Sequence, residues 1–187
     1  MIDGATAFAA IVQQRSFWAY KGQGASPTPR PSMVRIARPD EEDKIFDVLI
    51  MLSEENAIAP TNEERIRAMI RRCRGPENGK MRDGVIGLID APNGGGIAAT
   101  CAVVMSQPWY SLAWYCEEIW TYVLPDYRAA KMGHAKALLN FEKWWAEQLG
   151  MPLFVGIISK TRTLGKMRLY SREMPLVGAS FLWRGAS

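Results

Sequence analysis

Histidine and cysteine are scarce in this chain, and neither occurs in a metal-binding pattern. The single histidine, His134, argues against a histidine-based metal site and against a Ser-His-Asp triad. The three cysteines lie far apart, form no CxxC pair and are odd in number: Cys73, Cys101 and Cys116. This usage argues against a disulfide framework and favours a cytoplasmic protein with no metal site.

Long apolar segments are also missing. No run approaches the roughly 18 apolar residues that a membrane-spanning helix needs, so no membrane partner is expected. The composition is instead typical of one packed domain, with 187 residues, 48% hydrophobic and 22% charged. The net charge of +4 is compatible with an anionic ligand and does not require nucleic acid.

The first 32 residues differ from the rest of the chain. They are rich in residues that favour an irregular or polyproline-like segment: Gly22, Gly24, Pro27, Pro29 and Pro31. Met33 stands immediately before the first patterned strand. We therefore expect residues 1–32 to be an N-terminal extension or flexible tail, and residues 33–187 to form one domain.

Hydrophobic periodicity predicts strands and helices in the order β-α-α-β-β-β-α-β-α-β. The predicted strands are Val34–Arg38, Gly84–Asp90, Ile97–Ser106, Glu117–Leu124, Leu153–Ser159 and Gly178–Arg184. The predicted helices begin at a cap on Asp40, at Thr61 or Asn62, at Lys131, and at Thr161 or Thr163. The run Leu153–Ser159 is nearly all apolar, which predicts a strand covered on both faces.

One face of the second predicted helix is rich in arginine: Arg65, Arg67, Arg71, Arg72 and Arg74. The other face carries the apolar stripe of Ile66, Met69 and Ile70. A solvated charged face is the favoured interpretation, and association with nucleic acid is the minority hypothesis.

The segment 117–139 is the most informative part of the chain. It predicts a strand, a turn at Pro125, a loop that opens with Arg128, and then an amphipathic helix. Such a junction directs backbone N–H groups and the positive end of a helix dipole at one point. The segment therefore predicts a cradle for a phosphate or pyrophosphate.

These residues resemble the GNAT acyltransferase superfamily, and the resemblance covers about Val34 to Trp183. Two motifs carry it: Val123-x-Pro125-x-Tyr127-Arg128-x-x-x-x-Gly133, and the pair Leu169-Tyr170. The resemblance is greatest to GNAT-like proteins of phages and prophages. It implies an α/β (α+β) fold, with a mixed, mostly antiparallel, twisted sheet of six to seven strands and about four flanking helices.

The resemblance also implies a cofactor site for acetyl-CoA, the acyl donor. The strand backbone at Tyr122 and Val123 would bind the pantetheine arm as an added strand would. The pyrophosphate would lie against the loop formed by Arg128, Ala129, Ala130, Lys131, Met132 and Gly133. Lys131 stands where the family has a central glycine, which lets the backbone approach the phosphates closely.

Two side chains are candidate catalytic groups by the same resemblance. Glu118 matches the strand position from which a glutamate deprotonates the amine, with Glu117 as the alternate. Tyr170 matches the donor of a proton to the departing thiolate. The competing interpretations are a solvent-facing strand end for Glu118 and a core-packing tyrosine for Tyr170. Trp109, Tyr110 and Trp114 are candidates for lining an acceptor pocket.

The sequence therefore predicts an N-acetyltransferase that moves an acetyl group directly from acetyl-CoA to an amine. The acceptor would be a small molecule or a protein, and a homodimer is possible. The alternative is a GNAT-like module that binds coenzyme A or a partner without efficient turnover, which Lys131 motivates.

Overall fold

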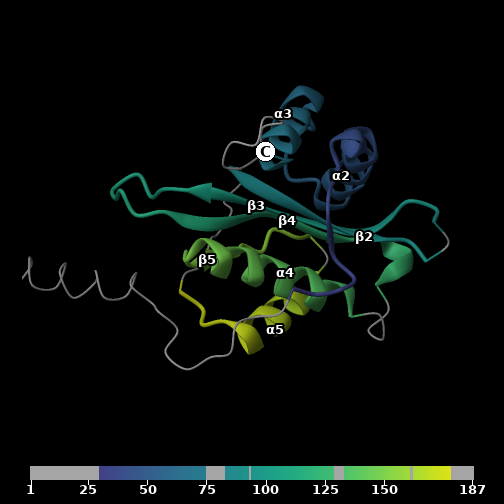
Figure 1. Ribbon diagram of the computed structural model, residues 1–187. Helices are drawn as coiled ribbons and strands as arrows, with labels where there is room; N and C mark the ends of the chain where they lie inside the picture. Colours follow the sequence, from purple (N-terminus) through teal and green to yellow (C-terminus); the bar gives the residue numbers. More distant parts are fainter. Residues whose placement is uncertain (1–29, 75–82, 93, 129–132, 161, 178–187) are drawn as a thin grey trace, which may run out of the picture.

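The computed structural model describes residues 30–74, 83–92, 94–128, 133–160 and 162–177 (Figure 1). The strands are β1 (Arg35–Ile36), β2 (Gly84–Asp90), β3 (Ile97–Ser106), β4 (Tyr115–Val123) and β5 (Leu153–Phe154). The helices are α2 (Glu42–Asn56), α3 (Glu63–Arg74), α4 (His134–Leu149) and α5 (Thr163–Glu173). Short 3-10 turns occur at η1 (Pro39–Glu41) and η2 (Pro125–Tyr127). This order agrees with the predicted one as far as α5.

The five strands of the described residues form one mixed sheet in the order β1-β2-β3-β4-β5. The first three pairings are antiparallel and the β4–β5 pairing is parallel. The expected α/β fold is thus observed with four α-helices, but the expected six to seven strands are not reached within these ranges. The predicted strand Gly178–Arg184 lies outside the described residues.

The prediction of a doubly covered strand over Leu153–Ser159 was wrong. Only Leu153 and Phe154 pair with β4, opposite Cys116 and Glu117. Beyond them the chain leaves the sheet, and Ile158 is 65% exposed. The run is apolar but does not form a central strand of the sheet. Farther along β4, the edge faces α5 instead of a strand, and Lys166 Nζ of α5 donates to the Thr121 carbonyl at 3.1 Å.

Helices cover both faces of the sheet, so each face has its own apolar core (Figure 1). On the α4 face, Leu138 and Phe141 pack in one cluster with Val85 and Val103. On the face of α2 and α3, Ile45 and Ile70 pack in a second cluster with Ile86, Leu88 and Trp120. The central strand β3 is buried along nearly its whole length, as a strand covered on both sides must be.

All three cysteines are buried and free, and they pack as small apolar side chains. Burial raises the pKa of Cys73 to about 12 and that of Cys116 to about 11. Both thiols therefore stay protonated near neutral pH and have little nucleophilic character.

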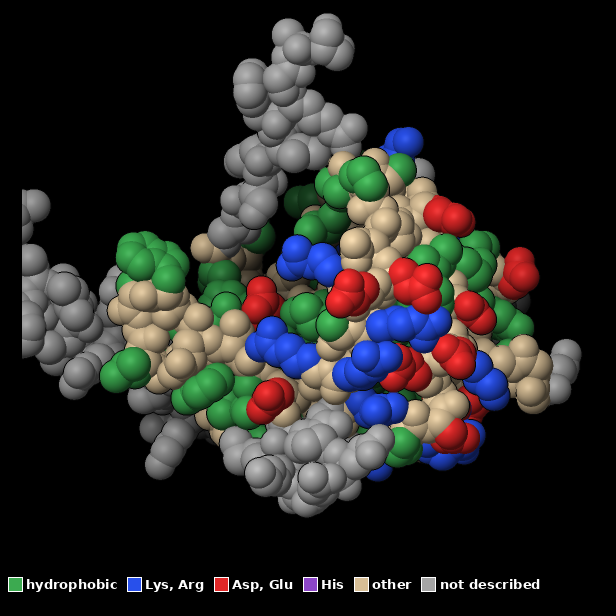
Figure 2. All heavy atoms as spheres, turned by 90° about the horizontal axis from the view of Figure 1, so that it is seen from above, with side chains coloured by type: hydrophobic (Ala, Val, Ile, Leu, Met, Phe, Trp, Pro, Cys, Tyr) green, Lys and Arg blue, Asp and Glu red, His purple; other side chains and the backbone are tan. Residues whose placement is uncertain are grey.

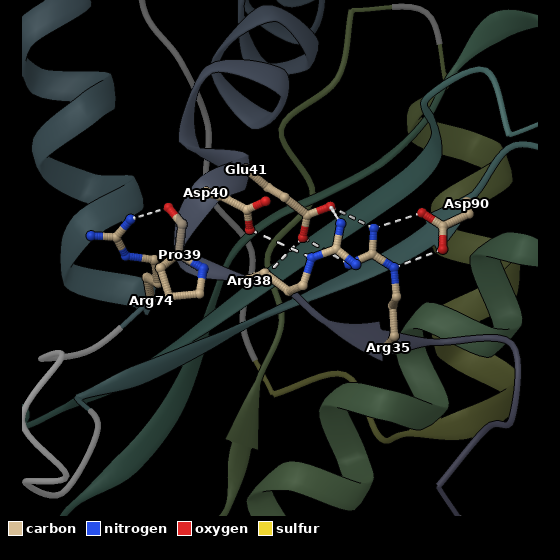
Figure 3. Close-up of polar contacts among 7 residues, drawn as sticks. All are labelled: Arg35, Arg38, Pro39, Asp40, Glu41, Arg74 and Asp90. Carbon is tan, nitrogen blue, oxygen red and sulfur yellow. Dashed lines mark hydrogen bonds and ion pairs between the residues drawn. The ribbon is translucent and has the colours of Figure 1, made fainter.

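The charged network around Glu41 corrects the predicted helix start (Figure 3). The cap is not Asp40: the Arg38 N–H donates to Glu41 Oε2 at 2.8 Å, and α2 begins only at Glu42. The Glu41 carboxylate is 1% exposed and accepts two hydrogen bonds of 2.7 Å from the Arg35 guanidinium, which also binds Asp90. These donors lower the pKa of Glu41 to about 2, with the Arg35 hydrogen bonds as the largest cause.

Glu41→Gln is expected to lower the free energy of unfolding near pH 7 by about 2–4 kcal/mol, since it leaves Arg35 and Arg38 with a weaker, neutral acceptor. The folded pKa of Glu41 lies below its unfolded value, so this stabilisation is present above about pH 4.5 and is lost as the pH falls towards 2. Urea denaturation from pH 7 to pH 2.5 measures it, with Asp40→Asn as the exposed control. A difference between wild type and Glu41→Gln that does not shrink in acid would contradict this account.

A glycine in β2 allows α4 to pack closely against the sheet. A Cβ atom at Gly87 would lie 2.8 Å from two ring atoms of Phe141 on α4 and 3.0 Å from Cys101 Sγ. Gly87→Ala is therefore expected to lower stability by about 1–3 kcal/mol through overpacking. Gly165→Ala in α5 is the matched control, because a Cβ there meets nothing within 4 Å and the change favours the helix by about 1 kcal/mol. Thermal denaturation should give the two variants opposite signs.

Candidate functional site

A bulge in β4 determines which side chains share the α4 face of the sheet. Ala102 pairs with Trp120 and Val103 with Glu118, so Ile119 is an extra residue on β4. Side chains three apart on a regular strand point to opposite faces. The inserted residue changes this, so that Glu118 and Thr121 both reach the helices on the α4 side.

The edge of β4 beyond the bulge is available for contacts other than a strand ladder. Within the described residues, β5 pairs with β4 only opposite Cys116 and Glu117. The next part of the edge is approached by α5, through the hydrogen bond from Lys166 Nζ to the Thr121 carbonyl. An extended ligand can bind such an edge through its own amide groups.

Tyr170 and Glu118 form a hydrogen-bonded pair beside this edge. The Tyr170 hydroxyl donates to Glu118 Oε2 at 2.8 Å, and the tyrosine is 6% exposed. Burial raises the pKa of Glu118, while the positive charge of Lys166 lowers it. Burial and then the charge of Glu118 raise the pKa of Tyr170, so the phenol keeps its proton near neutral pH. A proton acceptor and a proton donor are thus in direct contact.

Glu142 of α4 lies behind the pair and was not predicted from the sequence. It is fully buried, and Thr121 Oγ1 donates to its Oε1 at 2.6 Å. A signal was present: Glu142 follows Leu138 by four residues and so falls on the apolar stripe of its helix. A glutamate on such a stripe indicates a buried polar role.

The start of the predicted pyrophosphate loop is anchored by a second unpredicted glutamate. Arg128 donates from Nε to the Val123 carbonyl at 2.7 Å and from Nη2 to Glu55 Oε2 on α2. The Tyr122 hydroxyl donates to the same oxygen at 3.0 Å, and the guanidinium lies 5.2 Å from the centre of the Tyr122 ring. Glu117, the alternate candidate, has no hydrogen bond or ion pair to either cluster within the described part of the chain. Ala129 to Met132 lie outside the described residues, and Gly133, which precedes α4 as its N-cap, has φ of 65°.

A pocket of about 420 Å³ opens on the opposite face of the sheet, between α2 and α3. Its wall is largely apolar and reaches Trp120 of β4, while Asn62 and Arg65 line it with polar groups. The aromatic loop before β4 does not line it, and Trp109 is 96% exposed. This pocket is open to solvent, and the residues of that loop take no part in its lining.

The arginines of α3 are largely paired with carboxylates. Arg67 contacts Asp43 and Glu63, and Arg71 contacts Glu42. Figure 2 shows the positive and negative side chains interleaved on this surface. A partly neutralised face is less suited to a polyanion than the sequence alone suggests.

The described part of the chain lacks two further features. None of its helices has the length and apolar character needed to cross a membrane. Nor do those ranges contain a cluster of three or more His, Cys, Asp or Glu side chains arranged to hold a metal ion.

Several solved structures share this fold at low sequence identity. A predicted acetyltransferase from Clostridium acetobutylicum, solved with acetyl-CoA, has a TM-score of 0.60 and 17% identity, over 81% of this chain and 94% of that one. Glucosamine-6-phosphate N-acetyltransferase from Arabidopsis thaliana has a TM-score of 0.57 and 15% identity, over 82% and 97%. A GNAT family acetyltransferase from Staphylococcus aureus has a TM-score of 0.52 and 15% identity, over 81% and 96%. No protein-family model and no curated protein sequence matches the chain. The chain has the α/β fold of these acetyltransferases.

Glu55→Gln is expected to lower the free energy of unfolding by about 1–3 kcal/mol, because Arg128 and Tyr122 lose a charged acceptor. Glu54→Gln, one residue earlier and exposed, should change it little. Urea denaturation of both variants is the measurement. Equal effects at the two positions would show that the Arg128 contact contributes nothing to the fold.

Proposed function

We propose that this protein is an acetyl-CoA-dependent N-acetyltransferase that transfers the acetyl group directly to an amine. The Tyr170–Glu118 hydrogen bond beside the free edge of β4 carries the proposal. It places a proton acceptor and a proton donor together beside a part of β4 with which, among the described residues, no strand pairs. The shared fold with acetyltransferases supports it.

The donor would bind along β4 and at the start of α4. The backbone of Tyr122 and Val123 would contact the pantetheine arm, and the loop from Arg128 to Gly133 would hold the pyrophosphate. Arg128 is fixed by Glu55 and Val123, so its contribution would be to hold the loop entrance. The phosphates would then be bound by the N–H groups of the loop and the start of α4, with the charge of Lys131 in support.

The chemistry would be a closed proton relay. The amine nitrogen attacks the thioester carbonyl and gives a proton to Glu118, directly or through water. The carbon–sulfur bond breaks, the thiolate takes the Tyr170 proton, and Glu118 returns its proton to the phenolate along their 2.8 Å hydrogen bond. Protons balance, and both side chains regain their starting states.

The same contact would time the second transfer. Burial is the largest cause of the raised pKa of Tyr170, and the negative charge of Glu118 is the second. When Glu118 accepts the proton of the amine, this charge disappears and the phenol becomes a stronger acid. Tyr170 is therefore most able to donate when the thiolate is forming.

The acceptor class follows from the pocket between α2 and α3. Its apolar wall and its polar lining at Asn62 and Arg65 suit an amine that also carries an apolar part and a polar or anionic group. The pocket reaches Trp120 on the α2 and α3 face of β4, whereas Glu118 lies on the α4 face. An amine held in this pocket would therefore have to reach around the edge of β4 to meet Glu118.

A coenzyme A-binding module without turnover is the second candidate. Its support is that two carbonyls of β4 already have partners: Lys166 binds that of Thr121, and Arg128 binds that of Val123. A ligand lying along this edge would have to replace or share these contacts. Coenzyme A binding without acetyl transfer to any amine would favour this candidate.

Tyr170→Phe and Glu118→Gln are each expected to lower kcat about 100-fold with little change in the KM for acetyl-CoA, because each removes one transfer of the relay. The double variant should be scarcely slower than either single one. Thiol release from acetyl-CoA with a panel of amines measures this, and Tyr110→Phe, at a 66% exposed position, is the control. No acetyl-CoA binding by calorimetry, together with no transfer, would rule out the proposed function.

A further inference from the structure

Glu142 occupies a position that a glutamate rarely occupies. It lies in the middle of α4, and neither it nor its neighbours Leu138, Leu139 and Phe141 have any exposed surface. An ionised carboxylate without a positive partner is costly in such surroundings. The residue must therefore be neutralised by a proton or paired with a cation.

The contacts of Glu142 decide between these two states. Oε1 accepts the hydrogen bond from Thr121, while Oε2 is buried with no hydrogen-bond partner among the described residues. No salt bridge joins Glu142 to a described cation, in contrast to Glu41. Lys166 acts on it only at longer range, and donates its own hydrogen bond to the Thr121 carbonyl. If Glu142 carries a proton, this oxygen is therefore the one available to hold it.

The charges of the groups around Glu142 also indicate that one carboxyl group of the cluster carries a proton. The groups that face Glu142 are the Cys101 thiol from β3, Glu118 and Thr121 from β4, and Lys166 and Tyr170 from α5. Cys101 and Tyr170 are neutral, since burial raises the pKa of both. That leaves two carboxyl groups and one lysine, and the cluster is electrically neutral only if one carboxyl group keeps its proton.

We propose that Glu142 is a positioning residue, held as a neutral carboxylic acid behind β4, so that the single negative charge of the buried carboxyl pair resides on Glu118. Burial and then the charge of Glu118 raise the pKa of Glu142 well above its ordinary value, which agrees with this geometry. Glu118 is the member beside the lysine and the tyrosine hydroxyl, so it is the better place for the charge.

The catalytic role of Glu142 in this inference rests on the proposed function, whereas its protonation state does not. If Glu118 is the base, a neutral Glu142 leaves Glu118 ionised. Glu142 also fixes the strand that carries Glu118, through its hydrogen bond with Thr121. An ionised Glu142 would instead add a second negative charge and make Glu118 hold its proton. The protonation state of Glu142 can be measured whether or not the protein transfers acetyl groups.

The first test is the pH dependence of stability for the full chain. A folded pKa above the unfolded value means that the stabilisation is complete below about pH 4 and is lost as the pH rises. Relative to Glu142→Gln, the folding equilibrium constant of wild type should therefore fall about tenfold for each pH unit between that point and the folded pKa of Glu142. Glu147→Gln, on the exposed side of the same helix, should run parallel to wild type. Parallel curves for Glu142→Gln and wild type would overturn the proposal.

A second measurement needs no variant. The infrared spectrum of the native protein at pH 7 should contain the carbonyl band of a buried, protonated carboxylic acid, and the absence of that band would overturn the proposal.

If acetyl transfer is observed, the pH profile of kcat/KM tests the positioning role. Glu142→Met should move the acid limb upward by about one pH unit, because Glu118 loses a neutral polar neighbour that favours its charge. Glu142→Gln should keep the acid limb near its wild-type position, without most of that shift. Acid limbs that coincide for wild type and Glu142→Met would show that Glu142 serves only the fold.

Discussion

The extra residue at Ile119 is the constraint on which the candidate site depends. A regular β4 would direct Glu118 and Thr121 to opposite faces of the sheet, one toward α4 and one toward α2. With the bulge, Glu118 meets Tyr170 and Thr121 meets Glu142 on one face. Trp120, next to the bulge, still points to the other face and closes the pocket between α2 and α3. A single backbone irregularity thus arranges the polar cluster and the apolar pocket on the two sides of one strand.

Two buried glutamates show how surroundings decide the charge of the same side chain. Glu41 accepts four hydrogen bonds from Arg35 and Arg38, and its pKa falls to about 2. Glu142 accepts one hydrogen bond from a neutral hydroxyl and faces another carboxyl group, and its pKa rises. Both are almost completely buried, so desolvation alone does not distinguish them. Their hydrogen-bond donors distinguish them. Glu41 is ionised and joins β1 to α2, whereas Glu142 is suited to hold a proton.

The sequence predicted what depends on neighbouring residues. Asn62, one of the two predicted caps, caps α3 through its side-chain oxygen, which accepts the Arg65 N–H at 2.9 Å. Asp40 was a sound local choice of cap that failed, because Arg35 and Asp90 draw Glu41 into a network spanning 55 residues of sequence. The bulge at Ile119 and the pairing of Arg128 with Glu55 also depend on partners far along the chain. No local pattern contains that information.

The contacts of Lys166 and Arg128 suggest how the free edge of β4 can be ready for a ligand without being exposed to water. An unpaired edge of backbone groups invites unwanted strand pairing. Here two long cationic side chains bind the carbonyls of Thr121 and Val123, on either side of Tyr122. The proposed donor would have to displace or share these contacts, and Arg128 is the harder one to displace because Glu55 also binds its guanidinium. If the donor replaces the Lys166 contact, the features that favour a non-catalytic binding module would serve an enzyme as well, because they protect the edge while it has no ligand.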